Sequence, residues 1–324
     1  MKVSIIIVTF NSANVIKECL EALERQTFKD CETIVVDNQS TDNTIDIVKK
    51  FAGVKLVGLN ENRGFTGGNI EGLKYCHGEY IVLLNPDTEA VSEWLQKFVE
   101  AMDFHPEAGI CASKLVVHGT DLIDSAGDGC TTTGRGFKRG EGESAERYNE
   151  EEYVFGACGA AMLIRKELIQ DIGFLDDDFF LIFEDVDFCL RSQLAGWKCL
   201  FVPEALVYHK VRTSIGHMSD LAVYYSIRNA RIVLHKNFPL ILKIKFFHHH
   251  LIQEVATFIY FVIKHHKPKI YLRANRDFLK KVPSLNKKRK AIKKTISYRE
   301  LNQELSSIIK TSFIKTKLGK LING

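Results

Sequence analysis

The sequence lacks the patterns that mark several common classes of protein. Its eight cysteines form no C-x-x-C pair, and scattered cysteines in a chain of 324 residues favour a reducing compartment and mostly buried thiols. No G-x-G-x-x-G fingerprint and no Walker Lys-Ser/Thr pair occur, which argues against a dehydrogenase. There are no internal repeats, and the length suits one large α/β domain with an appendage, or two domains.

Long apolar runs are also scarce. Ile5–Val8 is too short for the apolar region of a signal peptide, and no small-residue cleavage site follows it. His248–Ile263 falls short of the roughly 20 apolar residues that span a bilayer, because His, Gln and Glu interrupt it. Since basic residues follow, this segment is predicted either as a membrane-interface helix or as an ordinary packing helix. We therefore expect a cytoplasmic protein that sits peripherally on the inner face of the plasma membrane if the first alternative holds.

Negative charge is scarce at the C-terminal end of the chain. Residues 264–324 carry 18 Lys or Arg against three Asp or Glu, a net charge of +15, whereas residues 1–263 carry a net charge of −11. An acidic body with a basic tail indicates a molecule of two parts, and such a tail suits an anionic surface of lipid head groups or nucleic acid. The alternative is a solvated tail with no such partner.

What the sequence does contain is an alternation of apolar strands and amphipathic helices. That order predicts a parallel sheet wrapped by helices. Residues 119–149 interrupt the order with many Gly, Thr and charged residues, and we predict a long surface loop or a hairpin there. From about Ser219 the pattern is helical to the end of the sequence. The first predicted strands are Lys2–Phe10, Glu32–Val36, Val54–Leu59 and Tyr80–Leu84.

Acidic residues stand where predicted strands end. Asp37 follows the strand TIVV and Asp87 follows IVLL, so both are expected at the edge of the sheet where open α/β folds bind ligands. Glu184, Asp185 and Asp187 begin the helix predicted after FFLIF. Each position has a structural alternative, because Asp37 can close a turn and Asp87 can cap the next helix. The three acids can also simply favour the positive end of the helix dipole.

A glycine-rich stretch, NENRGFTGGN, lies between the two strand-end aspartates at residues 60–69. Its glycines allow the backbone to approach a ligand closely, and Asn60, Arg63 and Asn69 offer polar groups. Such a stretch is more often only a loop. We predict a loop that precedes a helix at Ile70–Cys76.

Eight motifs occur in an order that resembles family 2 glycosyltransferases of the bacterial rhamnosyltransferase-like branch. They are TFNS, VVDNQSTD, NRGFTGGN, LLNPD, GACGAAMLIR, FFLIFEDVDFCLR, GWKCLFVPEALVYH and YYSIRNA. The resemblance covers roughly residues 2–235. It implies the GT-A fold, an α/β class with a Rossmann-like, mostly parallel sheet flanked by helices, followed here by a helical C-terminal extension. It also implies a catalytic domain over residues 1–217 and a helical, basic region over residues 218–324.

The resemblance implies a nucleotide-sugar donor and an inverting transfer. Many relatives have Asp-x-Asp where this chain has Asn85-Pro86-Asp87. The first carboxylate is thus absent, and Asn85 is left to contact the sugar or ribose. Arg63 would reach a phosphate, and Gly67 would let the donor approach the backbone. The expected donor-binding residues are Thr9, Asn11, Asp37, Arg63, Gly67, Asn85 and Asp87.

A departing nucleoside diphosphate develops charge that a divalent cation stabilises. The resemblance implies Mg²⁺ or Mn²⁺ held by Asp87 and His209, although a lone His at a strand end is more often a structural hydrogen-bonding residue. Matching FEDVDFCLR to the family pattern places the general base, which takes the proton of the acceptor hydroxyl, at Asp185. Residues 156–158 can also be explained by close strand packing. The expected acceptor-binding residues are Gly156, Ala157, Cys158, Glu184 and Asp187.

Three further residues have two interpretations each. Trp197 could stack on a sugar or belong to the core. Arg228 and Asn229, within YYSIRNA, could close over the site or lie on the surface of a helix.

The sequence thus predicts an inverting, metal-assisted glycosyltransferase of bacterial cell-surface polysaccharide synthesis. The donor would be a dTDP- or UDP-sugar, with dTDP-rhamnose as one candidate, and the acceptor a glycan or a lipid-linked sugar. Peripheral membrane contact through the basic C-terminal region is expected, and nucleic acid is not. The alternative is a non-catalytic sugar-binding scaffold with the same fold, which Asn85 motivates and the intact EDVD argues against.

Overall fold

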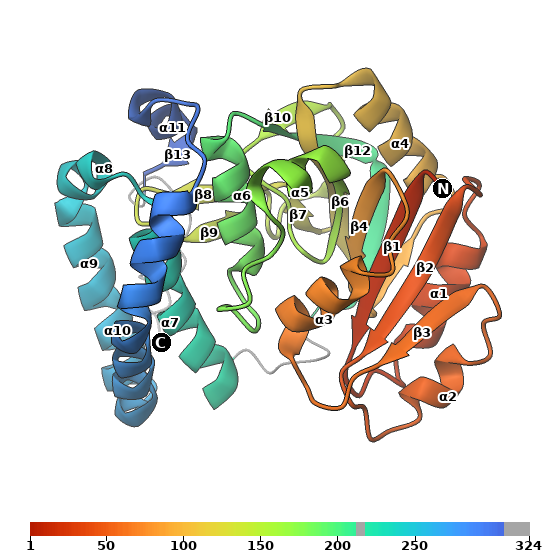
Figure 1. Cartoon of the computed structure of the whole chain (residues 1–324), viewed down its shortest axis with the longest axis horizontal. Coiled ribbons are helices and arrows are strands. Elements are labelled where there is room, and N and C mark those ends of the chain that lie inside the picture. Colours follow the sequence, from red (N-terminus) through yellow and green to blue (C-terminus); the bar gives the residue numbers. More distant parts are fainter. Residues whose placement is uncertain (212–217, 308–324) are drawn as a thin grey trace.

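The computed structural model describes residues 1–211 and 218–307. Within these ranges one large sheet has the strand order β10-β12-β6-β11-β4-β1-β2-β3, with β5 beside β12 and β7 beside β6, and a small second sheet has the order β13-β8-β9 (Figure 1). The strands of the large sheet are β1 (Val3–Thr9), β2 (Cys31–Asp37), β3 (Val54–Gly58), β4 (Tyr80–Leu84), β5 (Thr88–Ala90), β6 (Ala108–Val117), β7 (Ile123–Ala126), β10 (Glu152–Val154), β11 (Ala161–Arg165) and β12 (Lys198–His209). Those of the small sheet are β8 (Asp128–Thr131), β9 (Gly136–Lys138) and β13 (Leu305–Ser306).

The four predicted N-terminal strands are confirmed as β1 to β4, and they run parallel to one another. All side chains of β1 and β4 are buried, as expected for strands covered on both faces. β11 runs antiparallel to both β4 and β6, and β12 runs parallel to β6. The carboxyl ends of β1, β2, β4 and β12 therefore meet at one edge of the sheet, where the amino end of β11 also lies.

Helices cover both faces of the sheet. One apolar cluster joins α1 and α4 to one face, and another joins α3, α5, α6 and the C-terminal helices to the other. The helices are α1 (Ile16–Glu24), α2 (Thr44–Val48), α3 (Gly64–Leu73), α4 (Trp94–Phe104), α5 (Lys166–Ile172), α6 (Glu184–Leu194), α7 (Asp220–Asn237), α8 (Leu240–Lys245), α9 (Phe247–Phe258), α10 (Pro268–Ala291) and α11 (Tyr298–Glu304). A 3₁₀ turn, η1 (Ala145–Arg147), and a π-helical turn, η2 (Ile259–Lys264), complete them.

Two sequence-based predictions of loops are wrong. In the glycine-rich stretch at residues 60–69 the helix α3 begins already at Gly64, because the glycines let the helix lie against the sheet: a Cβ on Gly68 would stand 2.6 Å from a methyl group of Val8 in β1. For residues 119–149 the surface-loop alternative is wrong and the hairpin alternative is confirmed, because β8 and β9 pair antiparallel. The segment forms β7, β8, β9 and η1, and residues 123–127 and 130–135 are buried.

The C-terminal helices stack at the end of the molecule opposite β3 (Figure 1). Apolar residues of α7, α8, α10 and α11 share one buried cluster with residues of β6, β11 and α6. The division expected between residues 217 and 218 borders residues 212–217, which lie outside the described residues, so it stays a prediction. None of the described helices combines the length and the apolar character needed to cross a membrane.

Candidate functional site

The carboxyl ends of β1 and β2 bring Thr9 and Asp37 together. The hydroxyl of Thr9 donates a hydrogen bond to Oδ1 of Asp37 at 2.9 Å, and Ser40 donates its hydroxyl and its backbone N–H to the same carboxylate at 2.6 and 2.8 Å. Asn11, with a φ of 50°, accepts a hydrogen bond from the backbone of Thr41 at 2.8 Å. Asp37 thus closes the turn after β2, and this ordered loop is where the nucleoside is predicted to bind.

The two predicted donor-binding residues at the start of α3, Arg63 and Gly67, have contacts within the protein. Arg63 forms an ion pair with Glu71 at 3.3 Å. A Cβ on Gly67 would lie 2.5 Å from the Cβ of Arg63, so packing within the helix already requires a glycine there. The predicted contacts of Arg63 and Gly67 with the donor stay predictions.

Asp87 and His209 meet at the same edge of the sheet. Nε2 of His209 lies 3.3 Å from Oδ1 of Asp87, and Nδ1 lies 2.9 Å from Oδ2 of Asp124. Oδ1 of Asp124 in turn contacts the ammonium group of Lys138 at 2.6 Å. Burial of His209 disfavours its charged form, but the hydrogen bonds to Asp124 and Asp87 outweigh this and raise the pKa of His209 to about 9.

The pair of Asp87 and His209 suits a divalent cation. Two ligands about 2.1 Å from one ion and at right angles to each other lie about 3 Å apart, and the observed separation of their ligand atoms is 3.3 Å. The bond from Nδ1 to Asp124 leaves Nε2 of a neutral His209 as the metal-binding nitrogen. Asn85 offers its backbone carbonyl to Thr88 at 2.6 Å, and its predicted contact with the sugar stays a prediction.

Asp185 lies in the first turn of α6 and lines a cavity of about 250 Å³. Its Oδ2 accepts the backbone N–H of Gly159 at 3.1 Å, and its Oδ1 accepts that of Val186 at 2.7 Å. Ligand atoms of Asp128, Cys158 and Asp185 lie within 4.8 Å of one another. Burial raises the pKa of Asp185, and burial together with the charge of Asp185 raises the pKa of Asp128 to about 7.

Lys138 connects the two groups of acids. It lies at the end of β9, lines the cavity of Asp185 and forms the ion pair with Asp124. Its charge lowers the pKa of both Asp124 and Asp185, in each case against the effect of burial. Sequence reasoning missed Lys138 and Asp124, because both fall in the segment predicted as a surface loop or a hairpin. The only signal there was a strand-like LIDSA before the glycines.

The other two acids of the EDVD motif differ from each other. Glu184 is 6% exposed, lines the same cavity, and its Oε2 has no hydrogen-bond partner within the described residues. Asp187 is fully buried and contacts Arg191 at 2.9 Å, Lys236 at 2.7 Å and Asn237 at 2.8 Å. Asp187 thus has structural partners in α6 and α7. For both Glu184 and Asp187, contact with the acceptor stays a prediction.

The segment that precedes Asp185 has an unusual backbone. Three of its bulky residues have left-handed φ angles, which cost free energy unless the surroundings impose them. They do so here, because the side-chain amide of Asn229 donates to the carbonyls of Leu181 and Ile182 at 2.8 and 2.7 Å. Arg228 donates to the carbonyl of Asp178. The three residues are Phe180, Ile182 and Phe183, with φ of 53°, 67° and 76°.

Arg228 and Asn229 are therefore neither a lid over the site nor exposed residues of a helix. They are 7% and 0% exposed, and they fix the chain that carries Asp185. Gly156 and Ala157 pack against Cys189, since a Cβ on Gly156 would stand 2.7 Å from that side chain and the N–H of Ala157 donates to its Sγ at 3.4 Å. Close packing thus accounts for the small size of Gly156, and Cys158 lies beside Asp185. This packing is compatible with contact with the acceptor, which stays a prediction for all three residues.

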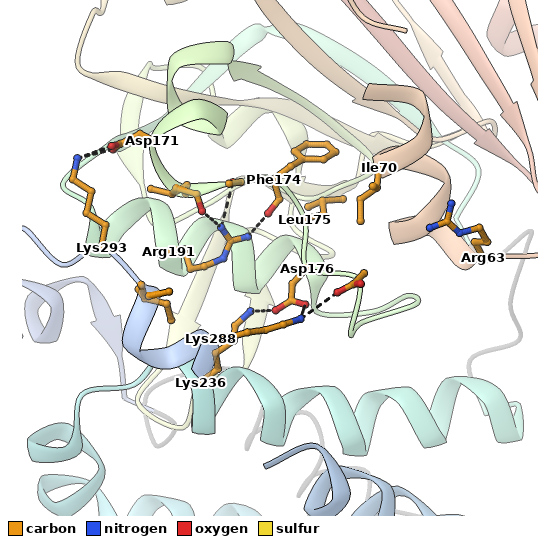
Figure 2. Close-up of a pocket in the computed structure, with 15 residues that line it drawn as sticks. Arg63, Ile70, Asp171, Phe174, Leu175, Asp176, Arg191, Lys236, Lys288 and Lys293 are labelled. Carbon is orange, nitrogen blue, oxygen red and sulfur yellow. Dashed lines mark hydrogen bonds and ion pairs between the residues drawn. The ribbon is translucent and has the colours of Figure 1, made fainter. Parts of the chain in front are cut away.

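Trp197 has a structural partner, because its indole N–H donates to Asp171 at 3.0 Å and its ring packs against the main apolar cluster. A second cavity, of about 550 Å³, lies beside Asp171 between α3 and the C-terminal helices (Figure 2). Arg63 stands at one side of it, while Lys236 and Lys288 point at Asp176. Its charged groups have ion-pair partners, and it does not contain Asp185. Of these two cavities only the smaller one contains the predicted base, so it is the candidate acceptor site.

Comparison with known proteins agrees with this geometry. Residues 4–173 match the sequence model of the family described as Glycosyl transferase family 2. The uncharacterized protein y4gI of Sinorhizobium fredii is 28% identical over 232 residues, which are 66% of this chain and 25% of that protein. The N-acetylglucosaminyl-diphospho-decaprenol L-rhamnosyltransferase of Mycobacterium tuberculosis is 24% identical over 247 residues, which are 68% of this chain and 80% of the relative. The chain thus spans about a quarter of the first relative and most of the second.

Solved structures show the same fold. S. aureus TarS 1–349 in complex with UDP-GlcNAc aligns with a TM-score of 0.58 at 22% identity, over 89% of this chain and 84% of that one. The mannosyltransferase PcManGT from Pyrobaculum calidifontis, in complex with GDP-Man and Mn²⁺, aligns with a TM-score of 0.54 at 17% identity, over 93% and 78% of the two chains. At these identities the likeness confirms the GT-A fold predicted from the sequence.

Proposed function

Because the chain belongs to glycosyl transferase family 2, we propose that it is an inverting, metal-assisted glycosyltransferase with Asp185 as its general base. Its donor would be a nucleotide sugar, and its acceptor a glycan or a lipid-linked sugar of bacterial cell-surface polysaccharide. The observation that carries the proposal is that Lys138 lies between the cavity of Asp185 and the group formed by Asp124, His209 and Asp87. Asp185 opens to a cavity of about 250 Å³, and Lys138 in its wall contacts Asp124, which holds His209 beside Asp87.

The base function suits the surroundings of Asp185. A carboxylate is a better proton acceptor when its pKa lies above the usual range, and burial raises the pKa of this one. The backbone N–H groups of Gly159 and Val186 fix its orientation. One carboxylate suffices for a single displacement with inversion, in which the acceptor oxygen attacks the anomeric carbon as its proton passes to Asp185 and the nucleoside diphosphate departs.

At the donor side, Asp87 and His209 would hold Mg²⁺ or Mn²⁺, which when bound stabilises the charge of the leaving diphosphate. Asp37 and Thr9 order the loop on which the nucleoside would rest. A dTDP- or UDP-sugar is the proposed donor class, supported by the rhamnosyltransferase relative and by the UDP-GlcNAc complex of the TarS neighbour. Reaction with a lipid-linked acceptor would place the protein on the cytoplasmic face of the membrane.

The test is a thermal-shift panel of dTDP-, UDP- and GDP-sugars, each with and without Mn²⁺. We expect one nucleotide class to stabilise the wild type in the presence of Mn²⁺, Asp87→Ala to lose the metal-dependent part, and Asp185→Asn to keep it. In a transfer assay with the donor so identified, Asp185→Asn should lose activity by a factor of 10³ or more. A wild type that no nucleotide stabilises would contradict the proposal. A fully active Asp185→Asn variant would exclude its base, and donor binding without turnover would favour the non-catalytic scaffold.

A further inference from the structure

Exposed apolar side chains gather on three consecutive C-terminal elements. Of the 19 large apolar side chains exposed in the described part of the chain, ten lie between residues 240 and 263. Single exposed apolar residues are ordinary, but a continuous group of this kind marks an interaction surface. We call it the outer face and define it by Ile244, Phe247, Leu251, Val255, Phe258 and Ile263, which are 68%, 65%, 56%, 51%, 43% and 57% exposed.

The helix at the centre of this face, α9, buries polar side chains and exposes apolar ones. A helix on a water-exposed surface buries its apolar side and exposes its polar side. In α9 the buried positions are polar and recur every fourth residue: His249, Gln253 and Thr257 are 6%, 8% and 4% exposed. They are not left without partners, since His249 hydrogen-bonds Thr132 at 2.8 Å and Gln253 donates to Thr257 at 3.2 Å. The orientation of α9 is thus fixed by polar contacts, and its apolar side faces outward.

The charges around the outer face have one sign. The segment from Leu240 to Arg273 contains six Lys or Arg and a single acid, Glu254, which is ion-paired with Arg231. The exposed members are Lys245, Lys264, Lys269 and Arg273. An apolar face bordered by cations is the composition that binds an anionic lipid surface, because the apolar groups enter the head-group boundary and the cations meet the phosphates.

The outer face is connected to the site of Asp185 by one hairpin. Thr132 and Arg135, in the turn between β8 and β9, contact the buried side of α9, with Arg135 donating to Thr257 at 3.2 Å. Three residues further on, Lys138 lines the cavity that contains Asp185. The helix that carries the outer face and the wall of the cavity are therefore parts of one packed unit, at the end of the molecule occupied by α8, α9 and α10 (Figure 1).

We propose that the outer face is the surface by which this protein lies on an anionic bilayer, the membrane that would hold a lipid-linked acceptor. The proposal rests on the proposed function for the acceptor, but the surface itself is independent of the sugar that is transferred. The sequence predicted that the basic C-terminal region contacts lipid through its charge. In this proposal the apolar side chains of the outer face contribute most of the binding free energy, and the cations add to it.

The experiment is flotation of the full chain with vesicles of phosphatidylcholine and phosphatidylglycerol. The test variant combines Leu251→Gln, Val255→Gln and Phe258→Gln, which keep good helix formers on one side of α9. The matched control is Phe104→Gln on α4, a side chain that is 80% exposed outside the outer face. We expect the wild type and the control to float and the affinity of the triple variant for vesicles to fall about tenfold or more.

The thermal shift with the donor is measured on all three proteins, and it separates this proposal from the proposed function. If the wild type does not float with the vesicles but the donor still raises its melting temperature, the outer face is not a lipid-binding surface. The proposed function would then be unaffected. A wild-type dimer that the triple substitution converts to a monomer, without vesicle binding, would assign the face to a second copy of the chain. A wild type that floats but responds to no nucleotide would support the surface and contradict the function.

Discussion

Asp124 determines which nitrogen of His209 faces Asp87. Because the carboxylate can only accept, it holds the proton of His209 on Nδ1 and leaves Nε2 toward Asp87. An amide in its place can donate to Nδ1 and reverse the tautomer. We predict that Asp124→Asn weakens Mn²⁺ binding about tenfold or more, measured by calorimetry in the presence of the nucleotide. Asp121→Asn, three residues away on the exposed side, should bind Mn²⁺ as the wild type does. Equal affinity in all three proteins would contradict this role.

Asp124→Asn should also change how the unfolding free energy depends on pH, and this can be measured without metal. The pKa of His209 is about 9 in the folded protein and about 6.5 as its ordinary value. The stabilisation by its charge is therefore complete below pH 6.5 and is lost as the pH rises through 9. Between pH 7 and 9.5 the metal-free wild type should lose about 2 kcal/mol of unfolding free energy from this group, and Asp124→Asn clearly less. Urea unfolding at the two pH values measures the difference.

At the scale of elements, the segment before α6 depends on α7. The amide of Asn229 satisfies two carbonyls of a stretch whose left-handed residues would otherwise relax. We predict that Asn229→Ala lowers the unfolding free energy by about 2–3 kcal/mol and lowers kcat of sugar transfer while the donor-induced thermal shift persists. Asn43→Ala, at an exposed amide before α2 whose side chain makes no capping hydrogen bond, is the control and should change neither. A variant with normal kcat would show that the backbone of Leu181 and Ile182 is held by other contacts.

The sequence predicted those elements whose pattern is local. β1, β2 and β4 contain apolar runs that end in or just before polar residues, and this local pattern needs no knowledge of partners. The start of α3 was mispredicted because the helix begins at Gly64, where propensity disfavours it and packing against β1 decides. The burial of the hairpin of β8 and β9 was not predicted, because α7 and α9, about 100 residues or more later in the chain, cover it.

The candidate site divides in the same way. Asp87 and His209 could be predicted to meet, since both follow strand ends at one edge of the sheet. Lys138 could not, because nothing in FKRG distinguishes it from its basic neighbours until the hairpin is folded. Asp187 was placed with Asp185 by motif, but on a helix two residues point in different directions, and its partners Lys236 and Asn237 come from α7.

At the scale of the whole molecule, part of the charge asymmetry is internal. Lys288 of α10 contacts Asp176, Asp177 and Asp178 at 2.5, 3.1 and 2.8 Å, and Lys293 contacts Asp171 at 2.6 Å. Basic residues of the C-terminal region thus form ion pairs with the acidic segment at residues 171–178, which precedes Asp185, and we call these ion pairs the clamp. Neither the lipid nor the solvated-tail interpretation of the basic charge predicted these contacts.

We predict that this clamp adds measurably to the stability of the whole chain. Lys288→Gln should lower the unfolding free energy by about 1 kcal/mol, a modest amount because the side chain is 36% exposed. Its neighbour Lys287 is exposed, so Lys287→Gln should have almost no effect. Since salt screens partly exposed charges, the difference between the two variants in urea unfolding should shrink from low salt to 1 M NaCl. A difference that salt leaves unchanged would mean that Lys288 acts through the packing of its alkyl chain rather than its charge. The clamp would then be an apolar contact of α10 with the acidic segment.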